Sequence, residues 1–200
     1  MAVLALASAN AQEETQKLSF AVGGGFTVPV GSAGQNLANG WNVRSGFGYN
    51  FTSHVGAMLD IGYDGMNING ATLGALGVPG GDVRVFSATL DPIVHLNPHG
   101  SVDFYLIGGG GVFHRFQEFT QPTVAVVNVY NPFFGVYPVA FNANQVLASY
   151  TVTRPGFDIG AGVAIGSKWH GKFFAESRWE HMFENNSHLD MIPVTFGYRW

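Results

Sequence analysis

The stretch that decides the fold is MIPVTFGYRW, residues 191–200. Its large apolar side chains occupy every second position: Ile192, Val194, Phe196, Tyr198 and Trp200. The intervening positions hold Met191, Pro193, Thr195, Gly197 and Arg199. Side chains of an extended strand alternate between its two faces, so this stretch predicts a strand with one large apolar face. Whether that face meets a protein core or lipid depends on the rest of the sequence.

The composition is unusual for a water-soluble domain. Hydrophobic residues make up 46% of the 200 residues and charged residues only 11%, whereas soluble domains carry roughly 25% charged residues. Only three lysines are present, Lys17, Lys168 and Lys172. The net charge of −4 and the lack of a basic run exclude a typical nucleic-acid binder. The absence of cysteine excludes disulfides and thiol chemistry.

The first residues, MAVLALASANAQEE, carry a short apolar run followed by Ala9-Asn10-Ala11. An apolar run before an A-x-A pattern is typical of a secretory signal peptide. We therefore predict that residues 1–11 are the remainder of such a signal, and that residues 12–200 form the exported domain. Export without cysteine indicates a bacterial envelope protein.

Alternation like that of residues 191–200 recurs along the chain, and no segment sustains an apolar stripe of helical spacing. The pattern predicts eight strands, near residues 18–30, 41–51, 55–66, 83–96, 102–117, 153–166, 172–183 and 189–200. The alternation is weakest in DPIVHL, residues 91–96, where Pro92 suggests a β-bulge.

The polar face of these strands combines glycine with charges of both signs, which is typical of a narrow lumen in which opposite charges pair. The opposite face is bulky and aromatic, as expected where strands contact lipid. The residues assigned to the lumen are Arg44, Asp60, Asp64, Arg84, Asp103, Arg115, Asp158, Glu176, Arg178, Glu180 and Arg199.

Short and long connections alternate along the chain. Residues 51–54, 97–100 and 167–171 are short, whereas 31–40, 67–82 and 118–152 are longer. Short turns on one side and long loops on the other are typical of outer-membrane barrels. Because lipid offers no hydrogen bonds, such a sheet must close on itself. We therefore predict an all-β, eight-stranded antiparallel up-and-down transmembrane β-barrel with both termini in the periplasm, in which the strand that ends at Trp200 pairs with the first strand.

The sequence resembles the outer membrane protein beta-barrel domain family, which includes the transmembrane domain of outer membrane protein A and the OmpX, Opa and OmpW types. The resemblance is carried by FAVGGGFTVPVG (20–31), YLIGGGGVF (105–113), FFAESRWEHMF (173–183) and PVTFGYRW (193–200). It implies an integral protein of the bacterial outer membrane, surrounded by outer-membrane lipids. It also implies that the barrel-assembly machinery reads a terminal aromatic signal formed by Phe196, Tyr198 and Trp200.

The segment 118–152 is long for a loop, and its Val, Phe and Tyr content is too hydrophobic for disorder. We predict an extended extracellular hairpin with YNPFFGVYP near its tip. Exposed aromatic side chains mark contact surfaces, so the candidate partner-binding residues are Tyr130, Phe133, Phe134, Tyr137 and Phe141. The alternative is that the segment folds over the barrel mouth as a cap.

Three other patterns suggest a phosphate site, a metal site and a catalytic site, but each lacks a feature that such a site needs. The glycines at 108–111 lie inside a strand, with no helix after them that could complete a phosphate site. The histidine spacings match no metal motif, so we expect neither metal nor cofactor. The stretch SRWEHMFENNS, residues 177–187, is similar to the active strand of lipid A deacylases, but Phe183 stands two residues after His181 where these enzymes have serine, and Ser187 is a distant substitute.

These observations favour a non-enzymatic outer-membrane protein with a structural or surface-contact role through its extracellular loops. The alternative functions are a narrow channel for small or hydrophobic solutes, as the OmpW resemblance implies, and less plausibly a lipid A-modifying enzyme. A soluble lipocalin-like barrel is the structural alternative. It would require the large hydrophobic side chains inside and the charges outside.

Overall fold

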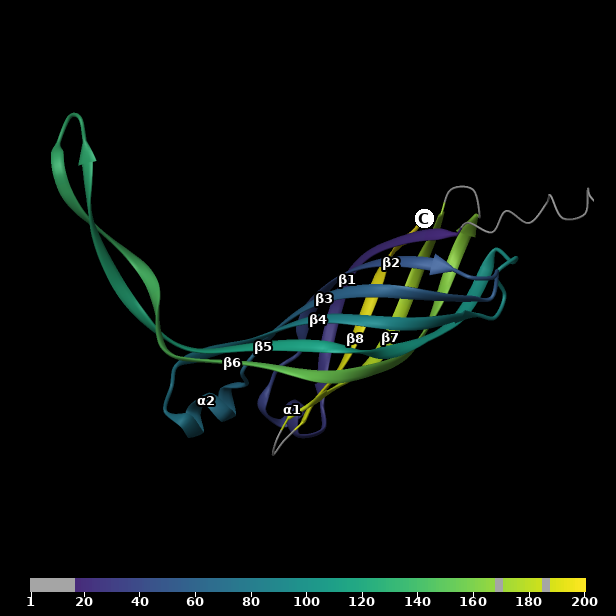
Figure 1. Cartoon of the computed structure of the whole chain (residues 1–200). Coiled ribbons are helices and arrows are strands. Elements are labelled where there is room, and N and C mark those ends of the chain that lie inside the picture. Colours follow the sequence, from purple (N-terminus) through teal and green to yellow (C-terminus); the bar gives the residue numbers. More distant parts are fainter. Residues whose placement is uncertain (1–16, 168–170, 185–187) are drawn as a thin grey trace, which may run out of the picture.

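The computed structural model describes residues 17–167, 171–184 and 188–200, so the predicted signal segment lies outside the described residues. Each strand pairs with its sequence neighbours in a closed antiparallel ring (Figure 1). The eight strands are β1 Leu18–Val30, β2 Gly40–Asn50, β3 Val55–Asn67, β4 Gly80–His95, β5 Val102–Asn131, β6 Gly135–Ser167, β7 Gly171–Phe183 and β8 His188–Arg199. The predicted eight-stranded up-and-down barrel is confirmed.

The barrel closes where β1 meets β8, in a register that runs from Ala21 opposite Arg199 to Val30 opposite Asp190. One residue further, the backbone groups of Phe20 and Trp200 exchange two hydrogen bonds of 2.8 and 2.9 Å. Closure leaves no open sheet edge around the wall, which is the condition for a sheet that spans lipid. The predicted pairing of the last strand with the first is therefore confirmed.

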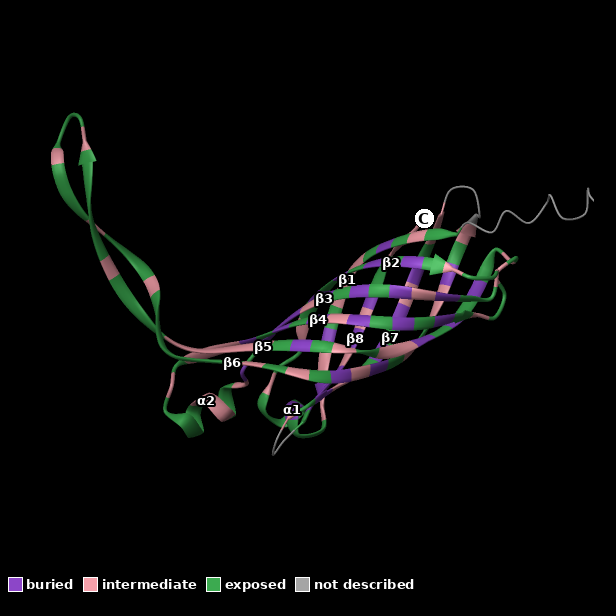
Figure 2. Cartoon of the chain, viewed as in Figure 1, coloured by how far each residue is buried: buried purple, intermediate pink, exposed green. Residues whose placement is uncertain are grey.

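The alternation read from the sequence corresponds to the two faces of the wall. Figure 2 shows buried and exposed positions alternating along the barrel strands. Along β2, for example, Trp41, Val43 and Phe47 are exposed, whereas Asn42 and Arg44 are buried. Around the barrel wall most large hydrophobic side chains point outward and most charged side chains point inward, which rules out the lipocalin-like arrangement.

The two ends of the barrel differ, as the connection lengths predicted. The β2–β3 and β4–β5 turns lie at the same end as the C-terminal residue, and two short helices lie at the other end (Figure 1). After the orientation predicted from the sequence, the first is called the periplasmic end and the second the extracellular end. These helices, α1 Gly31–Asn36 and α2 Gly70–Leu76, were not predicted, because such short segments show no apolar stripe. Asn69 caps α2 by accepting a hydrogen bond of 2.8 Å from the Thr72 amide, and Gly77 ends it at φ +67°. No helix among the described residues is long and apolar enough to cross a membrane.

The predicted hairpin is present, but its strands are longer than predicted. Strands β5 and β6 continue beyond the wall and pair with each other as far as Asn131 opposite Gly135. The predicted ends at residues 117 and 153 are therefore wrong, while the extended hairpin with its tip near residues 130–138 is confirmed. Figure 1 shows the hairpin standing clear of the barrel and bending to one side.

The bulge predicted at Pro92 is wrong. Strand β4 keeps one register with β5 on both sides of it, since Leu90 lies opposite Gly110 and Ile93 lies opposite Ile107. Asp91 and Ile93 are buried on the inner face, and Pro92 points outward between them. The alternation is unbroken, and only the mixture of polar and apolar residues on the inner face obscured it.

Candidate functional site

The centre of the barrel is a layer of buried ion pairs. Arg178 of β7 contacts four carboxylates: Glu176 at 2.5 Å, Asp91 at 2.8 Å, Asp158 at 3.1 Å and Asp60 at 3.2 Å. These acids come from β7, β4, β6 and β3, so one guanidinium group ties together strands around the ring. Its side chain is 3% exposed, and a charge at such depth requires this degree of pairing.

A second guanidinium group continues the layer toward the extracellular end. Arg44 of β2 contacts Asp60 at 3.2 Å and Asp64 at 3.5 Å, and it also pairs with Glu180. Asp60 lies between both arginines because it contacts Arg44 through Oδ1 and Arg178 through Oδ2. The two arginines and their carboxylates therefore form one connected network.

Carboxylates outnumber guanidinium groups in this network. Arg178 contacts four and Arg44 three, with Asp60 shared, and Arg199 lies 3.8 Å from Glu176, which makes six acids for three arginines. Neutral hydroxyl groups supply further donors: Thr27 donates to Asp64, Thr89 donates to Asp91 at 2.9 Å, and Tyr105 donates to Glu176 at 2.8 Å. These bonds fix the orientation of the acids, because buried carboxylates that lack donors are costly.

Apolar layers close the lumen on both sides of the charges. Toward the extracellular end lie nine buried apolar residues, among them Met66, Val85 and Phe113. Toward the periplasmic end lie seven, among them Met58 and Tyr105. A hollow of only about 10 Å³ remains beside Arg44 and Arg178. A water molecule needs about this much space, so the interior is a packed plug, as expected for eight strands.

The remaining lumen predictions have mixed outcomes. Asp103 is buried, pairing with His95 at 2.6 Å and with Lys172 at 3.7 Å. Arg115 lies at the extracellular mouth, 3.0 Å from Glu184. Arg199 lies inside the periplasmic end, with its guanidinium carbon 4.6 Å from the ring centre of Tyr105.

The assignment of Arg84 to the lumen is wrong. Its side chain is 44% exposed, and it shares the outward face of β4 with Phe86. It pairs there with Asp82 at 2.8 Å and with Glu118 at 3.2 Å. Every second position of β4 faces inward, beginning at Val83. Arg84 lies between two inward positions, so the alternation of the strand, and not the charge of the side chain, makes it face outward.

The glycines of β5 allow close approach of the neighbouring backbone. A Cβ atom on Gly109 would lie 2.1 Å from the carbonyl oxygen of Leu90 and 2.6 Å from a carboxylate oxygen of Asp91. Only a residue without a side chain fits at this position. The run 108–111 therefore allows the strands to pack and makes room for the ion-pair layer.

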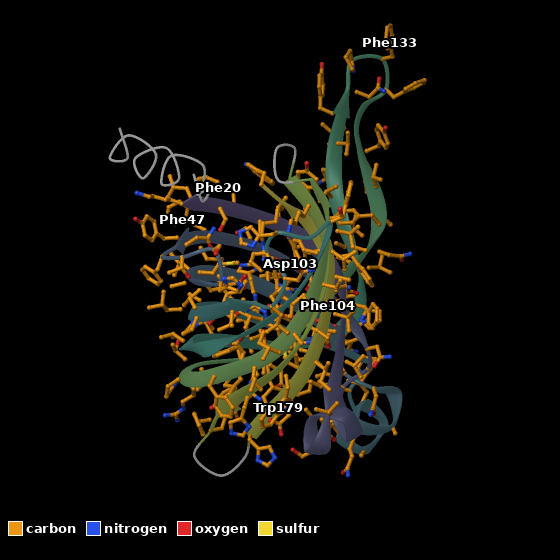
Figure 3. The ribbon with its side chains drawn as sticks, turned by 90° about the vertical axis from the view of Figure 1, so that its right-hand side faces the viewer. Phe20, Phe47, Asp103, Phe104, Phe133 and Trp179 are labelled. Atoms are coloured by element: carbon orange, nitrogen blue, oxygen red, sulfur yellow. The ribbon has the colours of Figure 1, made fainter. Side chains whose placement is uncertain are left out.

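The tip of the β5–β6 hairpin presents two phenylalanines to solvent. Phe133 is 90% exposed and Phe134 is 83% exposed. Their backbone amides donate to the side-chain oxygen of Asn131 at 2.8 and 3.3 Å, so the turn holds both rings outward. Gly135, at φ +75°, completes the turn. Figure 3 shows Phe133 at the end of the hairpin, far from Phe104 on the barrel wall.

The other predicted contact residues lie below the tip. Tyr130 is 70% exposed and pairs across the hairpin with Val136. Tyr137 is 40% exposed and Phe141 is 46% exposed. The structure therefore brings all five predicted residues onto one exposed segment.

A hollow of about 310 Å³ lies at the extracellular mouth. Ala33, Ile68 and Leu189 give it an apolar floor, and Arg115 and His188 contribute polar groups. On β5, the described residues that line it end at Phe119. The hairpin beyond that residue contributes nothing to its walls, which favours a free contact surface over the alternative of a cap.

Comparison with known protein families identifies the family of this barrel. The family profile named "Outer membrane protein beta-barrel domain" matches residues 1–199. The chain belongs to the outer membrane protein beta-barrel domain family. No curated protein sequence matches it. As a member of this family it is an integral protein of the bacterial outer membrane.

Solved structures share the fold of this outer-membrane barrel. Neisserial surface protein A (NspA) is 14% identical with a TM-score of 0.59, covering 92% of this chain and 96% of NspA. Ail, the attachment invasion locus protein of Yersinia pestis, is 14% identical with a TM-score of 0.51, covering 92% and 97% of the two chains. At this identity the likeness concerns the fold alone.

The histidine that suggested a deacylase has a different setting in this outer-membrane barrel. His181 pairs with Asp190 at 2.6 Å, and its ring lies 4.7 Å from that of Phe183 and 5.8 Å from that of Trp179. Ser187, the distant substitute for a nucleophile, lies outside the described residues. Within the part of the chain that the structure describes, no group of three or more His, Asp or Glu side chains is placed to hold a metal ion.

Sequence reasoning missed Asp91, one of the four acids around Arg178. Its neighbour Pro92 suggested an irregular strand, so the sequence pattern assigned Asp91 to neither face of the sheet. Counting alternate positions from Val83 and Val85 assigns Asp91 to the lumen. Unbroken alternation was the signal that could have found it.

Proposed function

We propose that this outer-membrane barrel is a non-enzymatic surface-contact protein, and that the tip of its β5–β6 hairpin is the contact site. The observation that carries the proposal is the exposure of Phe133 and Phe134, at 90% and 83%, on a turn that Asn131 holds in place. Large exposed apolar patches on soluble parts of a protein mark interaction sites. Tyr130, Tyr137 and Phe141 extend the contact surface down the hairpin.

The barrel serves as a rigid base in this proposal. The interior is packed with ion pairs and apolar side chains, and this supports an anchoring role in preference to the alternative of a solute channel. Ail is named for attachment and invasion. Because it shares only the fold with this chain, the proposal rests on the hairpin itself.

A shortened hairpin tests the proposal. Thr120 and Val146 are register partners, so residues 121–145 can be replaced by Asn-Gly, a pair that favours a two-residue hairpin turn. Bacteria displaying this variant should adhere to cultured animal cells no better than bacteria without the protein, whereas the complete chain should promote adhesion. Resistance of the folded barrel to unfolding on unheated gels confirms that the variant is assembled. Equal adhesion by both chains would exclude the hairpin as the contact site.

A further inference from the structure

The hairpin is unusual because it lacks charged side chains. Residues 119–153 contain no Asp, Glu, Lys, Arg or His. Among the described residues, those of β5 beyond Thr120 pair only with β6, and both faces of the hairpin are exposed there. A free-standing two-stranded hairpin is marginally stable in water, and edge strands in water are usually protected by charged side chains. This segment therefore has the composition of one that contacts an apolar phase.

The aromatic side chains are graded along the hairpin. The purely apolar rings of Phe133 and Phe134 stand at the extreme tip. Tyr130 and Tyr137, whose hydroxyl groups can hydrogen-bond to water or headgroups, stand in the second and third residue pairs behind the turn. This order matches the depth profile of a bilayer surface, where amphipathic rings lie at the headgroups and apolar rings lie deeper.

We propose that the hairpin tip, residues 130–137, inserts into the headgroup region of a phospholipid bilayer apposed to the bacterial surface. This rests on the proposed function, since it names the partner of the same contact site. From Thr120 to Asn131 the chain advances eleven residues, and at about 3.3 Å per residue this gives a reach of roughly 36 Å. The tip therefore extends well clear of the barrel wall (Figure 1).

The chemistry of the tip favours a phospholipid surface over a protein or lipopolysaccharide as its partner. Protein interfaces are enriched in arginine, and this segment has neither arginine nor any other charged side chain. The bacterium's own outer leaflet presents lipopolysaccharide, whose phosphates an uncharged tip cannot neutralise. A zwitterionic phospholipid surface requires no charge from its partner, so the interaction should be independent of salt and of anionic lipid.

The experiment uses the full chain held in a nanodisc and separate vesicles of phosphatidylcholine. Because the chain contains no cysteine, Pro132→Cys places a single environment-sensitive dye beside the two phenylalanines. Gln121→Cys places the same dye at the base of the hairpin. We expect vesicles to shift the emission of the tip dye to shorter wavelength, and brominated vesicle lipids to quench it. The base dye should not respond.

Paired variants then identify the residues responsible. Phe133→Ser with Phe134→Ser should lower vesicle co-sedimentation at least about tenfold, since burial of two phenylalanine rings is worth more than the 1.4 kcal/mol that corresponds to that factor. The matched change is Val124→Ser with Val126→Ser, which removes apolar side chains that are 62% and 63% exposed on the hairpin shaft. It should leave vesicle binding unchanged, at low and at high salt.

The remaining outcomes each overturn the inference. Quenching only by brominated lipids placed in the nanodisc would mean that the tip contacts its own membrane. An equal loss of binding in both paired variants would point to association along the hairpin edges, as between two copies of this chain. If the vesicles do not bind while adhesion to cells still depends on Phe133 and Phe134, the partner is a protein, and the proposed function stands without this inference.

Discussion

Arg178 and Asp91 form a salt bridge of 2.8 Å inside the barrel, although 87 residues separate them in the sequence. They extend from β7 and β4, so the bond crosses the lumen between strands that are not neighbours in the ring. Both side chains are inaccessible or nearly so, at 3% and 0% exposure. The centre of the barrel is therefore held by electrostatic contacts across it as well as by the hydrogen bonds of its wall.

Replacing Arg178 should destabilise the barrel strongly. Arg178→Met leaves four buried carboxylates without their shared partner, and breaking a buried pair in this way costs about 3–5 kcal/mol. Urea unfolding in detergent micelles measures the loss. Arg84→Met, which removes an arginine on the exposed outer face, should change the free energy of unfolding by less than about 1 kcal/mol. Equal losses of unfolding free energy in the two variants would show that the ion pairs of the lumen stabilise the barrel no more than those of an exposed arginine.

The sequence was sufficient for the strands of the barrel wall, because alternation is a local property. It was insufficient for the ion pairs, since the contact of Arg178 with Asp91 depends on strand register and on the stagger of the whole ring. Arg84 was misplaced because its charge was given more weight than the parity of Val83 and Val85.

The hairpin strands were ended too early for a physical reason. In a stretch such as VAVVNV, residues 124–129, both faces are apolar. Alternation cannot appear where both faces of a strand meet the same environment, and here both are exposed. The tip residues were nevertheless identified, because their aromatic content does not depend on the assignment of faces.

The barrel should not conduct ions. The charged layer lies between two apolar layers, and the hollow beside Arg44 is only about 10 Å³. A planar bilayer containing the purified protein should show no steady single-channel current, provided that insertion is verified by protease protection of the barrel. Steady currents of one amplitude would contradict the packed interior and would support the channel alternative.

Adjacent glycines of β5 should differ strongly in their response to the same substitution. Gly109→Ala places a methyl group 2.1 Å from the carbonyl oxygen of Leu90, whereas at Gly110 the nearest atom would be 3.4 Å away. We expect Gly109→Ala to lower the free energy of unfolding by about 1–3 kcal/mol, the usual range for overpacking. Gly110→Ala should have little effect. Urea unfolding of the two variants, measured side by side, tests this prediction. Similar free energies of unfolding would mean that the strands can move apart at no energetic cost.

The terminal aromatic residues should affect assembly in the cell more than stability in detergent. Phe196 and Phe104 both face outward and are almost equally exposed, at 55% and 56%. Phe196→Ser and Phe104→Ser therefore remove similar lipid-facing rings, and refolding of the purified chains into detergent should be impaired to the same extent. If the assembly machinery reads Phe196, Tyr198 and Trp200, only Phe196→Ser should lower the amount of folded barrel in the outer membrane by several-fold. Heat-modifiable gel migration of isolated membranes gives that amount, and an equal decrease for the two variants would mean that the last strand carries no signal beyond its contact with lipid.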